Sequence, residues 1–403
     1  MTSEWKYGTL PQGWEVSTIG DYATIITDYV ANGSFASLAE NVQYKNTPDE
    51  AVLIRLVDYN NGFKGNFVFI NAHAYEFLGK SKLYGGEIII SNVGANVGTV
   101  FKCPNLPYKM SLAPNAIMLR TKGIDDFFYY WFSSPIGQHA LKSIVTGSAQ
   151  PKFNKTTFRK ITVPVPPLDM QRKIADFLCC IDEKIACNNR INDNLQQQAA
   201  ALFANFYDRA ETEVGFTEII QILGGGTPKT GESSYWNGNV PFFTPKDVGL
   251  PYTLTTEKTI TEEGLAHCNS RLYPINTVFV TARGTVGKVG LSGVPMAMNQ
   301  SCYALVGKDT HQLLVYFYTL KAVDRLKHKA SGAVFDAITT REFESEIISK
   351  LSDIDAKAFL DIAEPIYRAV LSNSIENLRL VALRDSLLPK LMSGELDVSD
   401  IQL

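Results

Sequence analysis

Two short stretches of the chain place polar side chains beside or between closely spaced glycines. The first is EIIISNVGANVGTVF, with Asn92 and Asn96, and the second is NTVFVTARGTVGKVG, with Arg283, Thr285 and Lys288. Arg or Lys can form hydrogen bonds to guanine and Asn or Gln to adenine, which distinguishes the bases. Glycine lets the backbone approach a ligand closely. Both stretches are therefore candidate base-reading loops, and the alternative is a simple hairpin turn.

Further loop segments contain the residue types that hold phosphates or read base edges. In the first half of the chain these residues are Arg55, Tyr59, Asn60, Lys80, Lys82, Lys109, Ser111 and Asn115, and in the second half they are Lys229, Thr244, Lys246, Asn299 and Gln300. The alternative for an exposed lysine is a solvated side chain without a ligand. A basic cluster at Arg325, Lys327 and Lys329 has helical spacing and is interpreted as a solvated face.

Short apolar runs flank each glycine loop, which predicts a strand, a tight turn and a second strand. The recurrence of this pattern indicates an internal repeat. A shift of 185 residues places Gly147 on Gly332 and Phe158 on Phe343, near the ends of the two halves. The chain is therefore interpreted as a duplication with one strand-rich globular domain in each half. Two aromatic stretches, 125–134 and 313–323, are assigned to the cores of these domains.

The same shift aligns two heptad patterns, each of which predicts a long helix with an apolar seam. The first seam comprises Ile174, Leu178, Ile181, Ile185, Asn188, Asn192, Leu195, Ala199, Leu202 and Phe206, and the second comprises Phe359, Ala363, Ile366, Val370, Asn373, Asn377, Leu380, Arg384, Leu387 and Leu391. Asparagine at a seam position costs stability but fixes register. The predicted partner of each seam is the other seam, in an antiparallel pair; the alternative is a seam on another chain.

The ends of the long helices have sequence signals of their own. Prolines at 164, 166 and 167 exclude a helix before residue 168, and Asp169 is the predicted N-cap. Gly394 is the predicted C-terminal stop, and Pro365 predicts a kink or a late start in the second helix. Antiparallel pairing predicts that the two globular domains lie at opposite ends, related by a pseudo-two-fold axis. Such an arrangement suits a split DNA target.

The overall composition is that of a globular protein of two or three domains, with 403 residues, 45% of them hydrophobic, and a net charge of −3. No apolar run approaches the roughly 20 residues of a membrane span. The start of the chain has no export signal, and the six cysteines show no CxxC spacing, so we expect a cytoplasmic protein with free thiols. The five histidines form no metal-ligand motif. Residues 353–403 carry 5 basic and 9 acidic side chains, so any basic surface must be a local face elsewhere.

Several segments, in this order, resemble the specificity subunits of type I restriction-modification systems. They are LPQGWEVSTIGDY at 10–22, GGEIIISNVGANVGTVF at 85–101, VPVPPLDMQRKIADFL at 163–178, GGGTPKTGESSYWNGNVPFFTPKDV at 224–248, ARGTVGKVG at 282–290, MNQSCYAL at 298–305 and LRDSLLPKLMSGEL at 383–396. The first half departs from the pattern, with LAPNAIML at 112–119 in place of MNQSCYAL and an extra loop residue, Asn96. The resemblance therefore implies two diverged recognition domains with different half-sites.

The resemblance implies an α+β fold, with two pseudo-repeated target-recognition domains alternating with two long helices that pair as an antiparallel coiled coil. The domains would span residues 1–167 and 209–352, and the helices would lie within 168–208 and 353–403. It further implies a subunit without catalysis that reads a bipartite, asymmetric site in double-stranded DNA. Two adenine-methylating modification subunits and the restriction and translocase subunits would be its partners. S-adenosylmethionine, ATP and magnesium would belong to those partners.

Two other functions compete with this interpretation. The chain could be a coiled-coil assembly scaffold whose globular domains bind protein rather than DNA. It could also be a self-contained restriction or methylation enzyme. The second alternative is disfavoured because the sequence contains no NPPY-type box, no GxGxxG loop and no GxxxxGK[ST] loop.

Overall fold

The computed structural model describes residues 5–249, 251–329, 337–396 and 398. Contacts within the chain form two compact units. The first unit comprises the residues up to Glu183 together with those from Leu380 onward, and the second comprises Lys184–Arg379. Each unit therefore contains one globular domain and a part of each long helix, and the unit boundaries fall within the helices rather than at their ends.

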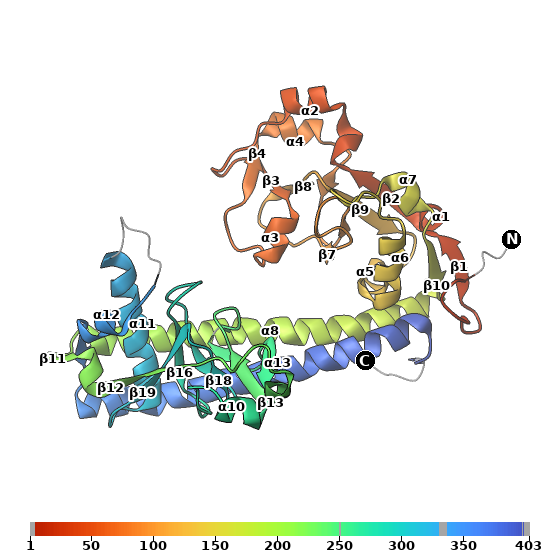
Figure 1. The fold of residues 1–403 in the computed structure, drawn as a ribbon. Coiled ribbons are helices and arrows are strands. Elements are labelled where there is room, and N and C mark those ends of the chain that lie inside the picture. The colour runs from red at the N-terminus through yellow and green to blue at the C-terminus, as the bar shows by residue number, and fades with distance from the viewer. Residues whose placement is uncertain (1–4, 250, 330–336, 397, 399–403) are drawn as a thin grey trace. The chain divides into compact units, whose positions relative to one another are not determined.

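The first domain and the helix that follows it are formed by 19 elements, shown in Figure 1. They are β1 (Glu15–Thr18), α1 (Ile19–Tyr22), β2 (Ala23–Asp28), η1 (Tyr29–Asn32), α2 (Phe35–Asn41), β3 (Ala51–Ile54), α3 (Leu56–Asn60), β4 (Val68–Ile70), α4 (Ala72–Phe77), β5 (Lys82–Leu83), β6 (Ile88–Ser91), β7 (Val100–Lys102), β8 (Lys109–Leu112), β9 (Ala116–Thr121), α5 (Asp125–Ser133), α6 (Pro135–Ser143), α7 (Lys155–Arg159), β10 (Thr162–Val165) and α8 (Leu168–Tyr207).

The second domain and its helix repeat much of this order. Their elements are β11 (Thr212–Gly215), α9 (Phe216–Ile219), β12 (Ile220–Gly224), η2 (Ser233–Tyr235), β13 (Trp236–Phe243), β14 (Tyr252–Thr253), β15 (Lys258–Ile260), α10 (Glu262–Ala266), β16 (Val278–Thr281), β17 (Val289–Ser292), β18 (Ala297–Met298), β19 (Cys302–Gly307), α11 (Gln312–Lys329), α12 (Thr340–Glu344), β20 (Ile347–Lys350) and α13 (Asp353–Ser393).

The two domains share the order of most strands in two sheets, although among the described strands the second domain adds β14 to one sheet and has no counterpart of β5 in the other. One sheet has the strand order β2-β9-β6-β7 in the first domain and β12-β19-β16-β17-β14 in the second. The other sheet has the order β4-β3-β8-β5 in the first domain and β15-β13-β18 in the second, and the β3–β8 and β13–β18 pairs are both parallel. In each domain the first and last strands pair antiparallel, as β1–β10 and β11–β20. The sequence repeat therefore corresponds to a repeat of structure.

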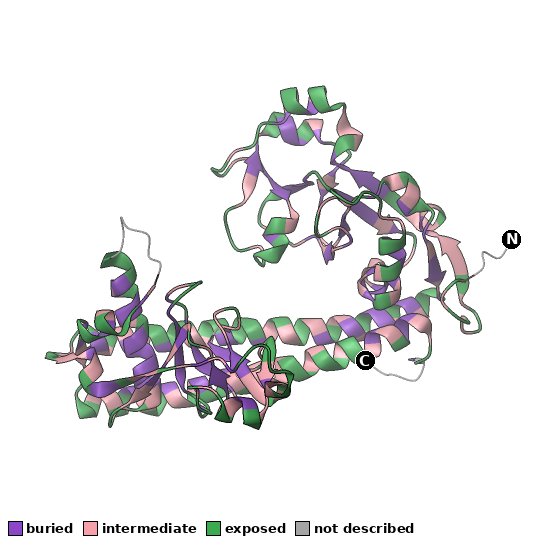
Figure 2. Cartoon of the chain, viewed as in Figure 1, coloured by how far each residue is buried: buried purple, intermediate pink, exposed green. Residues whose placement is uncertain are grey.

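The predicted core assignments are confirmed by burial. Phe127, Phe128 and Trp131 of α5 are fully buried, and α11 buries ten residues that include Tyr316 and Phe317. Phe158 and Phe343, aligned by the repeat, are both fully buried, whereas Gly332 lies outside the described residues. Figure 2 shows the strands of both domains mostly buried. The aromatic residues therefore stabilise the domains and do not form a surface for stacking bases.

Helices α8 and α13 pack together along their seams, and none of the twenty predicted seam residues is exposed. In the second unit Asn188 donates a hydrogen bond to Asn377 at 2.9 Å, and Asn373 donates one to Asn192 at 2.9 Å. Residue numbers rise on one helix as they fall on the other, so the pair is antiparallel. The repeat relates Asn188 to Asn373 and Asn192 to Asn377, so the two bonded layers are themselves related by a local two-fold axis. The seams are thus each other's partners within the chain, as predicted.

The helix ends agree with the sequence in part. Gly394 follows the last residue of α13 with φ +73°, which confirms the predicted stop. The prediction that Asp169 is the N-cap is wrong. Helix α8 begins at Leu168, and the Pro167 carbonyl accepts a hydrogen bond from the Gln171 N–H. Asp169 lies in the first turn, where a negative charge interacts favourably with the helix dipole. Helix α13 begins at Asp353, twelve residues before Pro365, so the predicted late start is wrong.

Candidate nucleic-acid interface

The two glycine loops are hairpins, as the sequence predicts. Strands β6 and β7 pair antiparallel through Ile90 and Val100, and β16 and β17 through Val280 and Val289. The glycines carry the backbone through positive φ angles, +101° and +92° at residues 94 and 98, and +83° and +75° at residues 284 and 287. A side chain would be strained at these four positions. The hairpins therefore need glycine for their own geometry, whatever else their side chains do.

The hairpin of the second domain borders a groove of about 490 Å³. Ten residues line it, namely Thr244, Pro245, Lys246, Glu257, Lys258, Arg283, Gly284, Thr285, Asn299 and Ser301. Five of these were predicted to contact DNA: Thr244, Lys246, Arg283, Thr285 and Asn299. Strand pairing explains why they meet. Parallel pairing of β13 with β18 sets Phe243 beside Met298, and pairing of β16 with β19 sets Thr281 beside Cys302, so the segments that follow these strands converge.

Hydrogen bonds within the chain already occupy several polar atoms of this groove. The Thr244 hydroxyl donates to Asp247 at 2.6 Å, and the Thr285 hydroxyl donates to the Pro245 carbonyl at 3.1 Å. The Asn299 side-chain oxygen accepts from the Ser301 N–H at 3.1 Å. These three side chains therefore fix the walls of the groove, and Thr244 and Thr285 have little capacity left to donate to a ligand.

Cationic groups of the groove remain available. Arg283 is exposed, and its guanidinium has no hydrogen bond or ion pair with any residue that the structure describes. The Lys258 ammonium lies 5.6 Å from the centre of the Trp236 ring, a cation–π contact that leaves its hydrogen atoms free. Lys246 is 81% exposed and lies 3.8 Å from Glu257. A pair this exposed contributes little stability and can exchange partners. The groove is thus suited to a ligand rich in hydrogen-bond acceptors.

The first domain has a larger groove, of about 780 Å³, at the corresponding strand ends. Of the predicted residues it contains Asn92 and Asn115. It also contains groups that the sequence reading missed: Lys152, Asn154, Lys155 and Thr156 from the segment that enters α7, and Val30, Phe35 and Tyr44 from the segments around α2. The first of these segments was recognised as part of the internal repeat, but its lysines were not predicted to contact DNA.

The residues that line the first groove differ in character. Phe35 is 82% exposed and forms an apolar rim together with Val30 and Tyr44. Asn115 has a positive φ of +69°, an exposed side chain, and no side-chain hydrogen bond to the rest of the described chain. Asn92 is less available, because its amide donates to the Phe153 carbonyl at 3.1 Å. An exposed amide beside apolar groups can contact both the polar edge of a base and a thymine methyl.

Several residues predicted to contact DNA instead form ion pairs or hydrogen bonds within the chain. Arg55 caps α3 and bonds Asp58 at 2.6 Å, Lys82 bonds Glu76 at 2.8 Å, and Lys109 is paired with Glu50. The prediction for Ser111 is wrong, because the residue is fully buried in β8 and its hydroxyl donates to the Ser81 carbonyl at 3.1 Å. Period-two alternation along β8 turns this side chain inward, which the loop-like sequence around it did not reveal.

The other predicted contacts lie outside both grooves. Tyr59 is partly exposed and stacks on Phe101 at 4.8 Å, and the Thr227 hydroxyl donates to the Gln300 side chain. The remaining five residues, Asn60, Lys80, Asn96, Lys229 and Lys288, are exposed. Their roles stay predictions.

The basic cluster on α11 is not simply a solvated face. Arg325 and Lys329 both pair with Glu346, a carboxylate that is 1% exposed. Their charges hold α11 against the strand segment at β20. Lys327 alone of the three has no ion pair among the described residues, and it lies against Gly287 of the hairpin. The face is therefore solvent-exposed, as interpreted, but two of its three charges also form ion pairs with Glu346.

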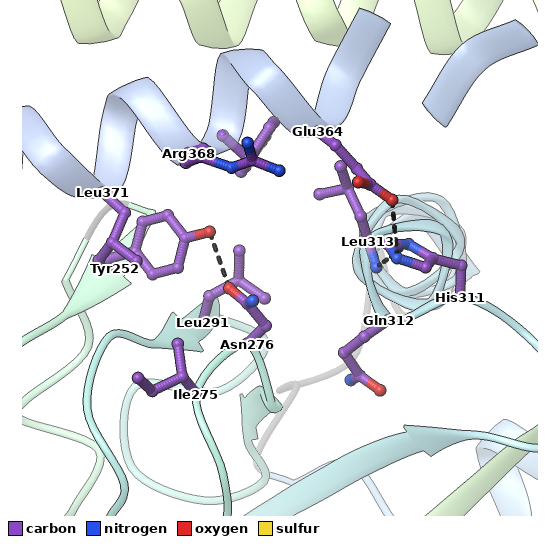
Figure 3. A pocket seen from close by; sticks show the side chains of 11 residues that line it. Tyr252, Ile275, Asn276, Leu291, His311, Gln312, Leu313, Glu364, Arg368 and Leu371 are labelled. Atoms are coloured by element: carbon purple, nitrogen blue, oxygen red, sulfur yellow. Dashed lines mark hydrogen bonds and ion pairs between the residues drawn. The ribbon is translucent and has the colours of Figure 1, made fainter. Parts of the chain in front are cut away.

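A third hollow, of about 290 Å³, lies within the second unit and is shown in Figure 3. Glu364 and Arg368 project into it from α13, and His311 bonds Glu364 at 2.9 Å. On its other side the Tyr252 hydroxyl donates to Asn276 at 2.9 Å. None of the predicted DNA contacts lines this hollow.

Comparison with known proteins identifies the family. The sequence profile described as "Type I restriction modification DNA specificity domain" matches twice, over residues 11–197 and 212–350. This chain belongs to the type I restriction-modification specificity family. Each match covers one of the two domains described above, so the internal duplication is a duplication of the specificity domain. Specificity subunits are non-catalytic, which agrees with the prediction that this chain is not an enzyme.

Curated relatives and a solved structure agree with this family. The Type I restriction enzyme MjaIX specificity subunit of Methanocaldococcus jannaschii is 31% identical over 136 residues, which are 32% of each chain. The HindI specificity subunit of Haemophilus influenzae is 24% identical over 328 residues, covering 61% of this chain and 71% of the relative. The crystal structure of the type I S subunit from M. genitalium matches 99% of this chain and 100% of that chain, with a TM-score of 0.57 and 14% identity. The last comparison supports the α+β fold.

The described helices include none with the length and apolarity needed to cross a membrane. All six cysteines are free thiols.

Proposed function

We propose that this chain reads a bipartite, asymmetric DNA target, with one half-site bound by each specificity domain. The observation that carries the proposal is the groove of the second domain, where five independently predicted contact residues come together. The first domain has a groove at the equivalent strand ends, but with different side chains. Two grooves of unlike chemistry in one chain fit a target whose halves differ.

The partners follow from membership of the family. In this proposal two adenine-methylating modification subunits dock on the paired helices α8 and α13, and restriction and translocase subunits join them in the cytoplasm. S-adenosylmethionine, ATP and magnesium would be bound by those partners. Surface charge supports a local contact with DNA, since the C-terminal segment that carries most of the net negative charge contributes to neither groove.

The proposal is tested by mapping methylated adenines in a host that has no adenine methylation of its own. The host would express this chain together with its modification subunit, and single-molecule sequencing would read the methylated sites. We expect one motif of two short, unlike half-sites separated by a gap of fixed length. A protein-binding scaffold predicts no motif, and so does any function in which the domains do not contact bases.

A variant of the first groove sharpens this test. Asn115→Gly removes the exposed amide and retains a residue that tolerates φ +69°. We expect one half-site to become less selective while the other is unchanged. Asn66→Gly is the matched control, because Asn66 is also exposed, also has a positive φ (+52°) and lies outside the groove. Equal loss of selectivity in both half-sites would contradict the assignment of one half-site to each domain.

A further inference from the structure

The groove of the second domain presents mainly donors to a ligand. Its uncommitted side-chain groups are the guanidinium of Arg283, the ammonium of Lys258, the hydroxyl of Ser301 and the amide nitrogen of Asn299. The acceptors are largely occupied: Asp247 at its edge accepts from Thr244 and from the Glu257 N–H, and Glu257 lies beside Lys246. A complementary ligand surface would therefore consist mainly of acceptors.

Two acceptor surfaces occur on DNA. One is the phosphate backbone, and the other is the major-groove edge of guanine, where N7 and O6 are adjacent acceptors. Adenine, cytosine and thymine each present a donor or a methyl group at that edge. Lysines on the rim of a groove suit the phosphates, because an ammonium binds as a point charge without a preferred plane. The planar fork of Arg283 matches the paired acceptors of guanine.

The backbone of Arg283 is fixed while its side chain is free. Its N–H donates to the Ser301 carbonyl at 3.3 Å, and the residue forms a bridge with Ala337. Gly284, which follows directly, has φ +83°, and among the described residues other than its two chain neighbours only the Pro245 side chain lies within 4 Å of the place where a Cβ would lie. A reader of bases needs this combination, since an anchored Cα defines the position along the duplex and an unpaired guanidinium remains to bind.

The corresponding residue in the first domain cannot make this contact. The corresponding residue is Val93. It forms a β-bridge with Lys152, as Arg283 does with Ala337. A glycine follows directly in both cases, Gly94 and Gly284. Valine has no donor. The two hairpins, built alike, thus differ at the one position where the second presents a guanidinium.

We propose that Arg283 reads a guanine in the half-site of the second domain, with Lys258 and Lys246 holding adjacent phosphates. This inference rests on the proposed function and adds the identity of one base to it. A paired contact of this kind discriminates against a wrong base by roughly five- to 150-fold. At the equivalent position of the other half-site, no guanidinium from the hairpin selects the base.

The experiment uses the full chain assembled with its modification subunit. After the methylation motif is mapped, four duplexes are made for each base pair of the second half-site, differing only at that pair, and their relative methylation rates are measured. We expect a guanine at one position to be preferred by wild type within the range given above. Arg283→Ala should abolish the preference at that position only, and Arg283→Lys should retain part of it.

Arg271→Ala is the matched control, because Arg271 is an exposed arginine of the same domain that does not line the groove. It should leave all preferences unchanged. If Arg283→Ala slows methylation of all four duplexes equally, Arg283 holds a phosphate and the guanine assignment is overturned, while the bipartite function stands. If wild type yields no motif at all, the proposed function itself fails.

Discussion

The two domains meet the long helices through different chemistry, although they share one fold. In the first unit the junction includes a polar network beside its apolar core. Lys102 of β7 bonds Asp126 of α5 at 2.9 Å, and the Tyr130 hydroxyl donates to Asp182 of α8 at 2.7 Å. Asp182 also accepts from Arg384 of α13 at 2.7 Å. Four elements, β7, α5, α8 and α13, are thus joined by charge-assisted hydrogen bonds.

In the second unit aromatic packing replaces this network. Strand register places Leu291 where the first domain has Lys102, and the repeat places Tyr367 where it has Asp182. The Tyr367 ring lies 5.7 Å from both Tyr316 and Phe317. The hollow of Figure 3 lies beside these rings. Both units bury apolar side chains between domain and helices, but the first adds specific polar partners where the second has Tyr367 and its aromatic neighbours.

The difference predicts where each unit is most sensitive to substitution. Removal of a buried aromatic ring lowers the free energy of unfolding strongly, because it leaves a cavity. A partly exposed polar network loses less, because water can replace the missing partner. The following substitutions test this contrast, and hydrogen exchange followed by mass spectrometry can measure the effect in each unit separately.

Phe203→Ala should have the largest effect. The Phe203 ring is 2% exposed and lies 4.8 Å from Phe317 and 5.4 Å from Phe359. We expect the second unit to lose about 3–5 kcal/mol of stability, the usual cost of a buried Phe→Ala change. Its amide protons should exchange faster, with the first domain unaffected. Phe206→Ala is the control, because Phe206 is only partly buried and its ring lies 6.5 Å from that of Phe359. Equal losses of stability for the two variants would contradict the conclusion that Phe203 belongs to the aromatic core between the second domain and the long helices.

Arg384→Ala should have a smaller effect in the first unit. Burial alone would lower the pKa of Arg384, but hydrogen bonds to Asp182 and Asp385 raise it above its ordinary value. Because the side chain is 28% exposed, we expect a loss of about 1–2 kcal/mol. Arg368→Ala, on the same helix, removes a guanidinium that has no ion pair among the described residues, and it should cost less than about 0.5 kcal/mol. The idea of a polar junction fails if the two arginine variants are equally stable.

The sequence predicts those parts of the fold that depend on local periodicity. The heptads identified both helices and their asparagine layers, because seam spacing determines which residues meet. The hairpins were predictable because apolar runs flank glycines at turn spacing. Parallel pairing of β13 with β18 was not, since it joins segments more than 50 residues apart without a local signal. That pairing brings Ser301 to the groove, and the antiparallel pairing of β13 with β15 brings Lys258; both residues were missed.

The least predictable feature of the site was which side chains already form ion pairs or hydrogen bonds within the chain. Lys109 and Glu50 meet because β3 and β8 pair in parallel, so a residue that seems free in the sequence has a partner in the fold. Arg55 is different, because Asp58 follows it by three residues and a local pair could have been foreseen. A basic residue type alone is thus a weak signal for DNA contact. It becomes informative when the fold leaves the charge without a partner at a groove, as with Arg283.

The two domains also differ at the residue that directly precedes the first strand of each glycine hairpin. Glu87, directly before β6, is 1% exposed and accepts hydrogen bonds from Arg120 at 2.8 Å and from the Tyr84 N–H at 2.9 Å. The second domain has the uncharged Thr277 at the equivalent position, directly before β16. Burial alone would raise the pKa of Glu87, but the bond from Arg120 and the backbone donors hold it below its ordinary value of 4.5.

A lowered pKa in the folded state means that ionised Glu87 stabilises the first domain above about pH 4.5, and that this contribution is lost as the pH falls through the folded value. Glu87→Gln should therefore be less stable than wild type at pH 7, and the difference should shrink on acidification. Glu40→Gln, at an exposed carboxylate of α2, should follow the wild-type curve at every pH. Unfolding curves recorded between pH 3 and 7 measure this effect. A constant difference between Glu87→Gln and wild type would mean that the lost hydrogen bonds, rather than the lost charge, account for the stability.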